Sequence, residues 1–200
     1  MNTSPTLSMV RRAAVAVALT VAAGVAQAHE GHGTHGLTAG LAHPFAGADH
    51  LLAMIAVGVW SSVALPSAQR LAGPAFFLIA LLAGAVLGVQ TGVGLFVEAG
   101  VALSVTALGM LLLGRSRLPA YAGFALTTAA GLLHGLAHGA GWPLDSTFAA
   151  YAVGFVAGSA LLHAAGLLAG GWLARVPAWV WRLQAAGVGA AGLFMFASRI

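Results

Sequence analysis

Six long apolar stretches, separated by short breaks, dominate this 200-residue chain. About 20 apolar residues are enough for a helix to cross the hydrocarbon core of a bilayer. Only 12 side chains (8 basic and 4 acidic) carry a formal charge, or 6% of the chain, whereas soluble domains carry about a quarter. We therefore predict an all-α, polytopic membrane bundle of six transmembrane helices, and exclude a soluble enzyme, a disordered tail and a nucleic-acid-binding protein. The stretches are residues 37–65, 72–93, 96–114, 119–140, 146–171 and 178–198.

The first 28 residues have the pattern of a secretory signal peptide. Arg11 and Arg12 precede a short apolar run, which ends in the small-residue motif at residues 26–28. An uncleaved first helix is the alternative. Cleavage after Ala28 divides the chain into a signal peptide (1–28), a His-rich periplasmic N-terminus (29–36) and a six-helix transmembrane domain (37–200).

The arginines predict the orientation of the spans. The first, third and fifth breaks carry Arg70, Arg115, Arg117 and Arg175, whereas the second and fourth breaks carry none. By the positive-inside rule the arginine-bearing breaks face the cytoplasm. The mature N-terminus is then periplasmic, in agreement with a cleaved signal, and the protein is a multi-pass protein of the bacterial inner membrane. Arg199, at the opposite end of the last span, is the exception.

The ionisable residues within the spans are the candidate functional residues. Each costs roughly 2.5–3.5 kcal/mol to insert into a bilayer, so such groups usually line a cavity or a pathway. Imidazole and carboxylate ligands suit divalent nickel, cobalt or zinc and suit Cu(I) poorly, and the chain has no cysteine. The set is His43, Asp49, His50, Glu98, His134, His138 and His163.

Helical geometry divides this set. His134 and His138 are four residues apart, so their rings lie on one helix face, about 6 Å apart. His43 and His50 are seven residues apart, which separates them by about 10.5 Å along a straight helix. Either a kink at Pro44 and Gly47 brings them together, or they are two successive stations on one path.

The remaining polar residues allow two interpretations each. Asp49 is either a metal ligand or the acceptor that fixes the His50 ring. His163 is either an interhelical hydrogen-bonding group or part of the path. His29, His32 and His35 form either a weak metal-collecting tail, with the free amino group of His29 as a donor, or an exposed tail without a ligand. Glycines at four-residue spacing, as at Gly131, Gly135 and Gly139, predict closely packed membrane helices.

The sequence resembles the HupE/UreJ family of nickel/cobalt permeases. The run from His43 to Met54 has a His, five residues and then Asp-His, like the first mature span of that family. Residues 98–109 are similar to its acidic motif, and 133–139 to its fourth-span motif, in which Gly141 here replaces the final acidic residue. Tyr151, Phe155 and His163 match its fifth span.

This resemblance implies uptake of Ni²⁺ or Co²⁺ from periplasm to cytoplasm, for hydrogenase, urease or cobalamin assembly. The expected partners are the metal ion as substrate, the lipid bilayer and, as a candidate, a second copy of the chain; no prosthetic group and no nucleic acid are expected. We predict path ligands at His43, Asp49, His50, His134 and His138, with Glu98 contributing charge near the periplasm. Because protonated imidazole does not bind metal, we expect uptake to fall below about pH 6.

Two other functions fit the same residues. An intramembrane zinc-dependent hydrolase would hold Zn²⁺ on these histidines and activate a water, with Ser61 or Ser104 nearby. We expect this less, because a spread of more than about 10 Å along the first span suits a path better than a single centre. A haem-carrying subunit with a bis-His pair is the third function, and absorbance near 410 nm would reveal it.

Overall fold

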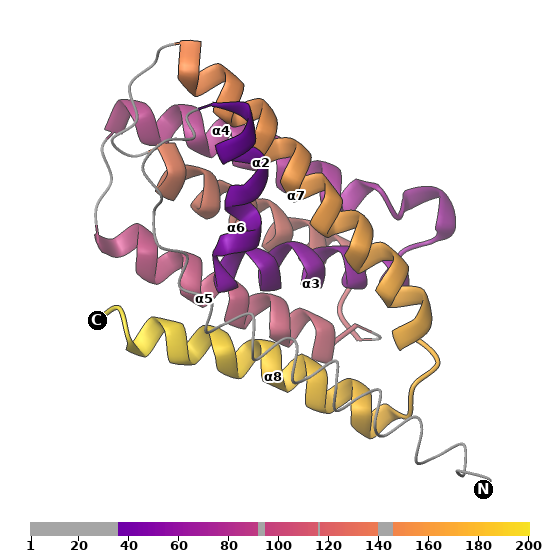
Figure 1. The fold of residues 1–200 in the computed structure, drawn as a ribbon. Coiled ribbons are helices and arrows are strands. Elements are labelled where there is room, and N and C mark those ends of the chain that lie inside the picture. The colour runs from indigo at the N-terminus through magenta and orange to yellow at the C-terminus, as the bar shows by residue number, and fades with distance from the viewer. Residues whose placement is uncertain (1–35, 92–94, 116, 140–145) are drawn as a thin grey trace, which may run out of the picture.

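The computed structural model describes residues 36–91, 95–115, 117–139 and 146–200, and it has no strand within those ranges. This confirms the all-α class. The predicted signal peptide, His29, His32, His35, Gly141 and Asp145 lie outside the described residues. The helices are α2 (Leu37–Ala46), α3 (Ala48–Ala64), α4 (Ala72–Thr91), α5 (Leu95–Leu113), α6 (Ala120–Gly139), α7 (Ser146–Leu173) and α8 (Ala178–Ala197), with a short 3₁₀ turn at Ser67–Gln69 (Figure 1).

The apolar stretches and the helices agree, with ends that differ by no more than two residues, except in the first stretch. Five helices within the described residues, α4 to α8, are long and apolar enough to cross a membrane. The first stretch forms two helices, α2 and α3, which are bent by 83° relative to each other. This pair makes a sixth crossing if both helices belong to one broken span.

The break between α2 and α3 lies at Gly47, which has extended backbone angles (φ −97°, ψ 126°). Pro44 lies inside α2 and does not end it. A Cβ on Gly47 would stand 2.8 Å from Asp49 Oδ1 and 2.9 Å from His50 Nδ1, so only glycine leaves room for those side chains. The kinked form of the first span is therefore confirmed, with Gly47 as the break.

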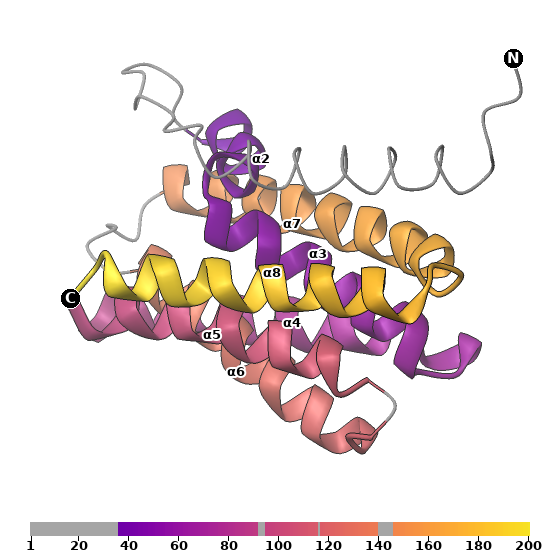
Figure 2. The ribbon, with the colours of Figure 1, turned by 90° about the horizontal axis from the view of Figure 1, so that it is seen from below.

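Glycines bring the helices into backbone contact, as their spacing predicted. On α6, a Cβ at Gly131, Gly135 or Gly139 would overlap the backbone of α4 at successive turns. On α7, Gly154 and Gly158 lie against α2, and Gly166 and Gly170 lie against α3. Small residues at such crossings allow the close approach on which membrane helix packing depends. In Figures 1 and 2, α7 runs alongside first α2 and then α3.

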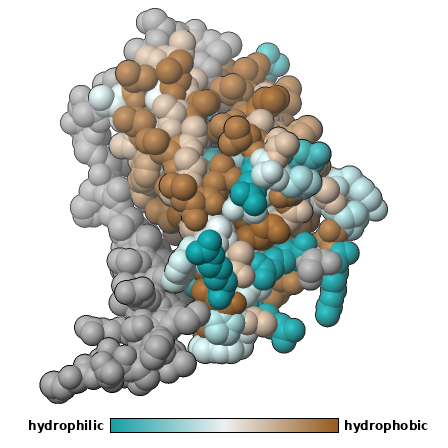
Figure 3. All heavy atoms as spheres, turned by 90° about the vertical axis from the view of Figure 1, so that its right-hand side faces the viewer, coloured by the Kyte–Doolittle hydropathy of each residue, from teal (hydrophilic) through white to brown (hydrophobic). Residues whose placement is uncertain are grey.

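These contacts also give the helix directions. Residue numbers rise together along the α4–α6 pair and along the α3–α7 pair, so the helices of each pair are parallel. The helices α5 and α8 are antiparallel, because Gly192 contacts Thr106 whereas Gly109 contacts Ala185. The connections α3–α4, α5–α6 and α7–α8 lie toward the same side in Figure 1. Figure 3 looks onto that side and shows hydrophilic residues gathered on its lower part.

Candidate metal centre

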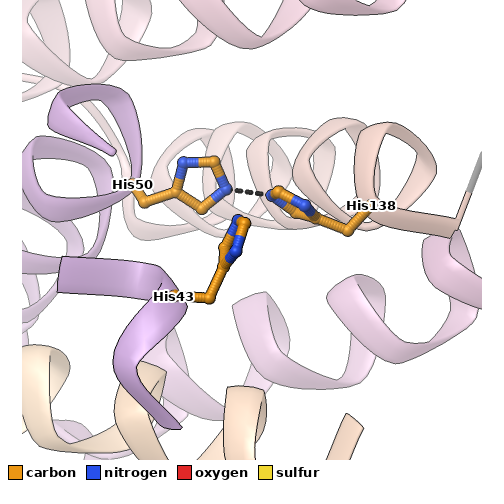
Figure 4. A group of neighbouring side chains, drawn as sticks. All are labelled: His43, His50 and His138. Carbon is orange, nitrogen blue, oxygen red and sulfur yellow. Dashed lines mark hydrogen bonds between the residues drawn. The ribbon is translucent and has the colours of Figure 1, made fainter. Parts of the chain in front are cut away.

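Three imidazoles meet at the bend between α2 and α3 (Figure 4). His43 comes from the last turn of α2, His50 from the first turn of α3 and His138 from the last turn of α6. One ring nitrogen of each lies within 4.8 Å of the other two. Nitrogens bound to one ion at about 2.1 Å lie at most about 4.2 Å apart, so small ring rotations would close the group on a metal. We call these residues the three-His cluster.

The bend makes this cluster, because it removes the separation that a straight helix would impose on His43 and His50. Their ring centroids are 5.7 Å apart, and that of His138 lies 4.6 Å from His43 and 4.4 Å from His50. The expectation that the histidines are spread along the first span is therefore wrong. The argument that the spacing of these histidines disfavours a single metal centre therefore no longer applies.

Asp49 acts on the cluster through His50. Its Oδ1 accepts hydrogen bonds from His50 Nδ1 at 2.5 Å and from the His50 backbone N–H at 2.7 Å. Its Oδ2 accepts from Arg199 at 2.6 Å. Both oxygens are thus occupied. Of the two interpretations, this geometry matches the acceptor that orients a ligating imidazole.

The hydrogen bond to Asp49 also determines what His50 offers to an ion. Because Nδ1 carries the proton, Nε2 has a free lone pair, and it faces His138 Nε2 in a close contact. Two lone pairs cannot face each other without a cation between them. Either a proton on His138 or a metal ion must join these two nitrogens.

Aromatic side chains of α7 surround the three-His cluster. The Phe155 ring lies 4.9 to 6.0 Å from all three imidazoles, measured between centroids, and Tyr151 lies 5.8 Å from His43. These rings give the cluster an aromatic environment on the α7 side, whereas the charged groups joined to it are Asp49 and, through Asp49, Arg199.

Two further histidines lie outside the cluster and deeper in the bundle. His134, one turn from His138, is 0% exposed, and its ring centroid is 4.8 Å from that of His50. His163 on α7 is 1% exposed. Each donates Nδ1–H to a carbonyl on its own helix, and neither Nε2 has a hydrogen-bond partner among the described residues. The Phe77 ring lies between them, 5.7 Å from His134 and 5.0 Å from His163.

Glu98 also lies outside the cluster, at the first turn of α5, and is 53% exposed at its side chain. It is joined to the site by Arg199, whose Nη1 lies 3.0 Å from the Glu98 carbonyl oxygen and 3.6 Å from Oε2. Sequence reasoning missed this role of Arg199. One feature of the sequence could have indicated it: Arg199 is the exception to the positive-inside pattern. An arginine at the end opposite the arginine-bearing breaks suggests a specific interaction.

Comparison with known proteins agrees with the motifs at this site. The family profile described as "HupE / UreJ protein" matches residues 17–195. The chain belongs to the HupE/UreJ family. It is 38% identical over 144 residues to "Protein HupE" of Rhizobium leguminosarum bv. viciae, covering 72% of this chain and 74% of that protein. No solved structure matches the chain.

Two carboxylates and one guanidinium lie beside the three-His cluster of this HupE/UreJ protein, since Arg199 is within ion-pair distance of both Asp49 and Glu98. Metal binding requires the imidazoles to be neutral, and the carboxylate of Asp49 is offset by the guanidinium of Arg199. A divalent ion in the three-His cluster would therefore keep most of its charge unneutralised.

Proposed function

We propose that this protein is an inner-membrane permease that carries divalent nickel or cobalt from the periplasm to the cytoplasm. The observation that carries the proposal is the cluster of His43, His50 and His138 within the apolar bundle. Transport requires ligands that replace the ion's water but release it again. Neutral imidazoles meet this requirement better than thiolates do, and they suit Ni²⁺ and Co²⁺.

The deeper histidines support a path that continues beyond the cluster. His134 and His163 each have an Nε2 without a hydrogen-bond partner among the described residues, so each is a candidate next ligand for an ion that leaves His50. The His134 ring centroid lies 4.8 Å from that of His50. The Phe77 ring lies beside both imidazoles, so an ion moving from one to the other would pass close to it. In this proposal Asp49 and Glu98 supply charge at the periplasmic end and do not bind the ion directly.

The helix directions support six spans that alternate across the membrane. Spans that alternate across a bilayer make the first and fifth parallel and the second and fourth parallel, as found for α3 with α7 and α4 with α6. In the same arrangement the third and sixth spans are antiparallel, as found for α5 with α8. We therefore count α2 and α3 as one broken span. Exposed arginines Arg70, Arg117 and Arg175 then lie in connections on the cytoplasmic side.

Uptake of radioactive nickel and cobalt by metal-starved cells tests the proposal. We expect uptake by the wild type, loss of uptake in His50→Ala and His138→Ala, and unchanged uptake in Gln90→Ala, a control at an exposed position of α4. All variants are compared at matched membrane levels. Absence of uptake by well-expressed wild type would refute the permease function.

The three-His cluster also favours one second function, a zinc-dependent hydrolase. Three imidazoles and one open position form the ligand set of hydrolytic zinc sites such as that of carbonic anhydrase. The serines proposed for that chemistry are elsewhere, since Ser104 donates to Val101 of its own helix and Ser61 packs near Gly73. Hydrolysis of an ester substrate by the zinc-loaded protein, lost in His138→Ala, together with no metal uptake, would favour this function instead.

A further inference from the structure

Arg199 connects three helices at the periplasmic end proposed above. It follows α8, and its guanidinium reaches the first turn of α3 through Asp49 and the first turn of α5 through Glu98. Its side chain is 26% exposed. No other arginine in the described ranges is within ion-pair distance of a described carboxylate.

The contact with Asp49 places Arg199 at the end of a chain of charged hydrogen bonds. Arg199 Nη2 donates to Asp49 Oδ2, Asp49 Oδ1 accepts from His50 Nδ1, and His50 Nε2 faces the cluster. A carboxylate behind a ligating imidazole raises its basicity and hence its metal affinity. An arginine bound to the other carboxylate oxygen partly neutralises the carboxylate. It therefore reduces the gain in basicity of the imidazole.

We propose that Arg199 is a positioning residue that weakens ion binding by the three-His cluster, so that a bound ion can leave. It holds Asp49 Oδ2 away from the ion and reduces the negative charge that Asp49 lends to His50. Glu98 keeps the guanidinium in place through its backbone carbonyl and carboxylate. This inference rests on the proposed function of the cluster.

Nickel binding to the purified full-length protein, measured by calorimetry with NiCl₂, tests the inference. Loss of Arg199 strengthens the Asp49–His50 pair and frees Asp49 Oδ2 for the ion. We expect Arg199→Gln to bind nickel about tenfold more tightly, at the lower end of the effect of residues behind metal ligands. Arg199→Lys keeps the charge and should stay near wild type. Arg182→Gln removes a charge from an exposed position of α8 and should change nothing.

Transport kinetics and a double-mutant cycle separate this role from a structural one. In proteoliposomes, Arg199→Gln should lower both the KM and the maximal rate of nickel uptake, because release becomes slower. A variant that merely unfolds loses rate without lowering KM. In an Asp49→Asn background, Arg199→Gln should change nickel affinity by less than about twofold, because its effect passes through Asp49.

Three results would overturn the inference. Unchanged or weaker nickel binding in Arg199→Gln would show that Arg199 does not oppose the ion. A tightening that persists in the Asp49→Asn background would show that it does not act through Asp49. If the wild type binds neither nickel nor cobalt, both the proposed function and this inference are refuted. If the wild type binds the metal and either of the first two results is found, only the inference is refuted.

Discussion

At the scale of single residues, the site depends on which nitrogen each histidine presents. His134 and His138 are equivalent in the sequence, four residues apart on one helix face. In the structure they differ, because His138 Nε2 meets His50 Nε2, whereas His134 Nε2 has no hydrogen-bond partner among the described residues. The Nε2 atoms of the two rings therefore have different surroundings, although both rings lie on one face of α6.

Substitution of these two histidines should separate binding from transport. His138→Ala removes one of three clustered imidazoles, so we expect nickel affinity to fall about a hundredfold, at least as much as for the loss of a residue behind a ligand. His134→Ala leaves the cluster intact, so affinity should change by less than about threefold while the uptake rate falls. Calorimetry and proteoliposome uptake measure the two quantities. Equal losses of affinity in both variants would contradict the separation.

The pH dependence of uptake is a second consequence of imidazole ligands. A free imidazole has a pKa of about 6.5, and a protonated ring has no lone pair for an ion. Lowering the external pH adds protons that compete with the metal, so we expect less nickel uptake at pH 5 than at pH 7.5. Initial rates in proteoliposomes with a fixed internal pH measure this. A flat profile over that range would count against histidine ligation.

At the scale of helices, glycine contacts and one glycine break give the bundle its form. The α6 glycines that contact α4 lie on the same helix as His134 and His138, and Phe77 lies on α4. This packing therefore fixes the positions of both histidines along the bundle relative to Phe77. Gly47 gives α2 and α3 the bend that brings His43 to His50. Helix packing and site geometry therefore depend on the same residue type.

Adding a methyl group at one packed glycine should destabilise the bundle. A Cβ at Gly135 would overlap the Leu81 carbonyl oxygen and the backbone near Ala85, whereas a Cβ at Gly187 on α8 meets nothing within 4 Å. Overpacking costs about 1–3 kcal/mol. We expect Gly135→Ala to lower the apparent melting temperature of the detergent-purified protein by about 3 °C or more. Gly187→Ala, the matched control, should melt like wild type, and equal shifts would refute this account.

At the scale of the whole molecule, the helix directions agree with six spans that alternate across the membrane, and the arginines carry the proposed orientation of those spans. The two lines of evidence are independent, because the directions come from backbone contacts and the arginine pattern from sequence. In the proposed orientation, the three-His cluster lies near the periplasmic end and His163 lies farther along α7, toward the cytoplasm.

Labelling of single cysteines tests this orientation, since the natural chain has no cysteine to remove. Gln69→Cys and Thr91→Cys introduce thiols at exposed positions near the two ends of α4. A membrane-impermeant maleimide added to intact spheroplasts should label Thr91→Cys alone, and Gln69→Cys only after permeabilisation. The reverse pattern would invert the topology, and labelling of both would show that α4 does not cross.

The sequence alone determined the helical class, the helix ends and the histidines of interest. These properties follow from local composition, because a run of apolar residues must satisfy its backbone hydrogen bonds within a helix once it is in lipid. The i, i+4 spacing of His134 and His138 is also local. The kink in the first span was one of two alternatives that the sequence left open. Motif spacing was specific enough to indicate the family.

Only the tertiary structure decided which histidines meet. The angle of the bend at Gly47 cannot be predicted from the spacing of the residues. The contact of His50 with His138 joins residues that are 88 positions apart in the sequence. The role of Asp49 depends on Arg199, 150 positions away, on a helix whose placement comes from its packing against α5. Such contacts depend on how whole helices pack, and helix packing depends on all the residues of both faces together.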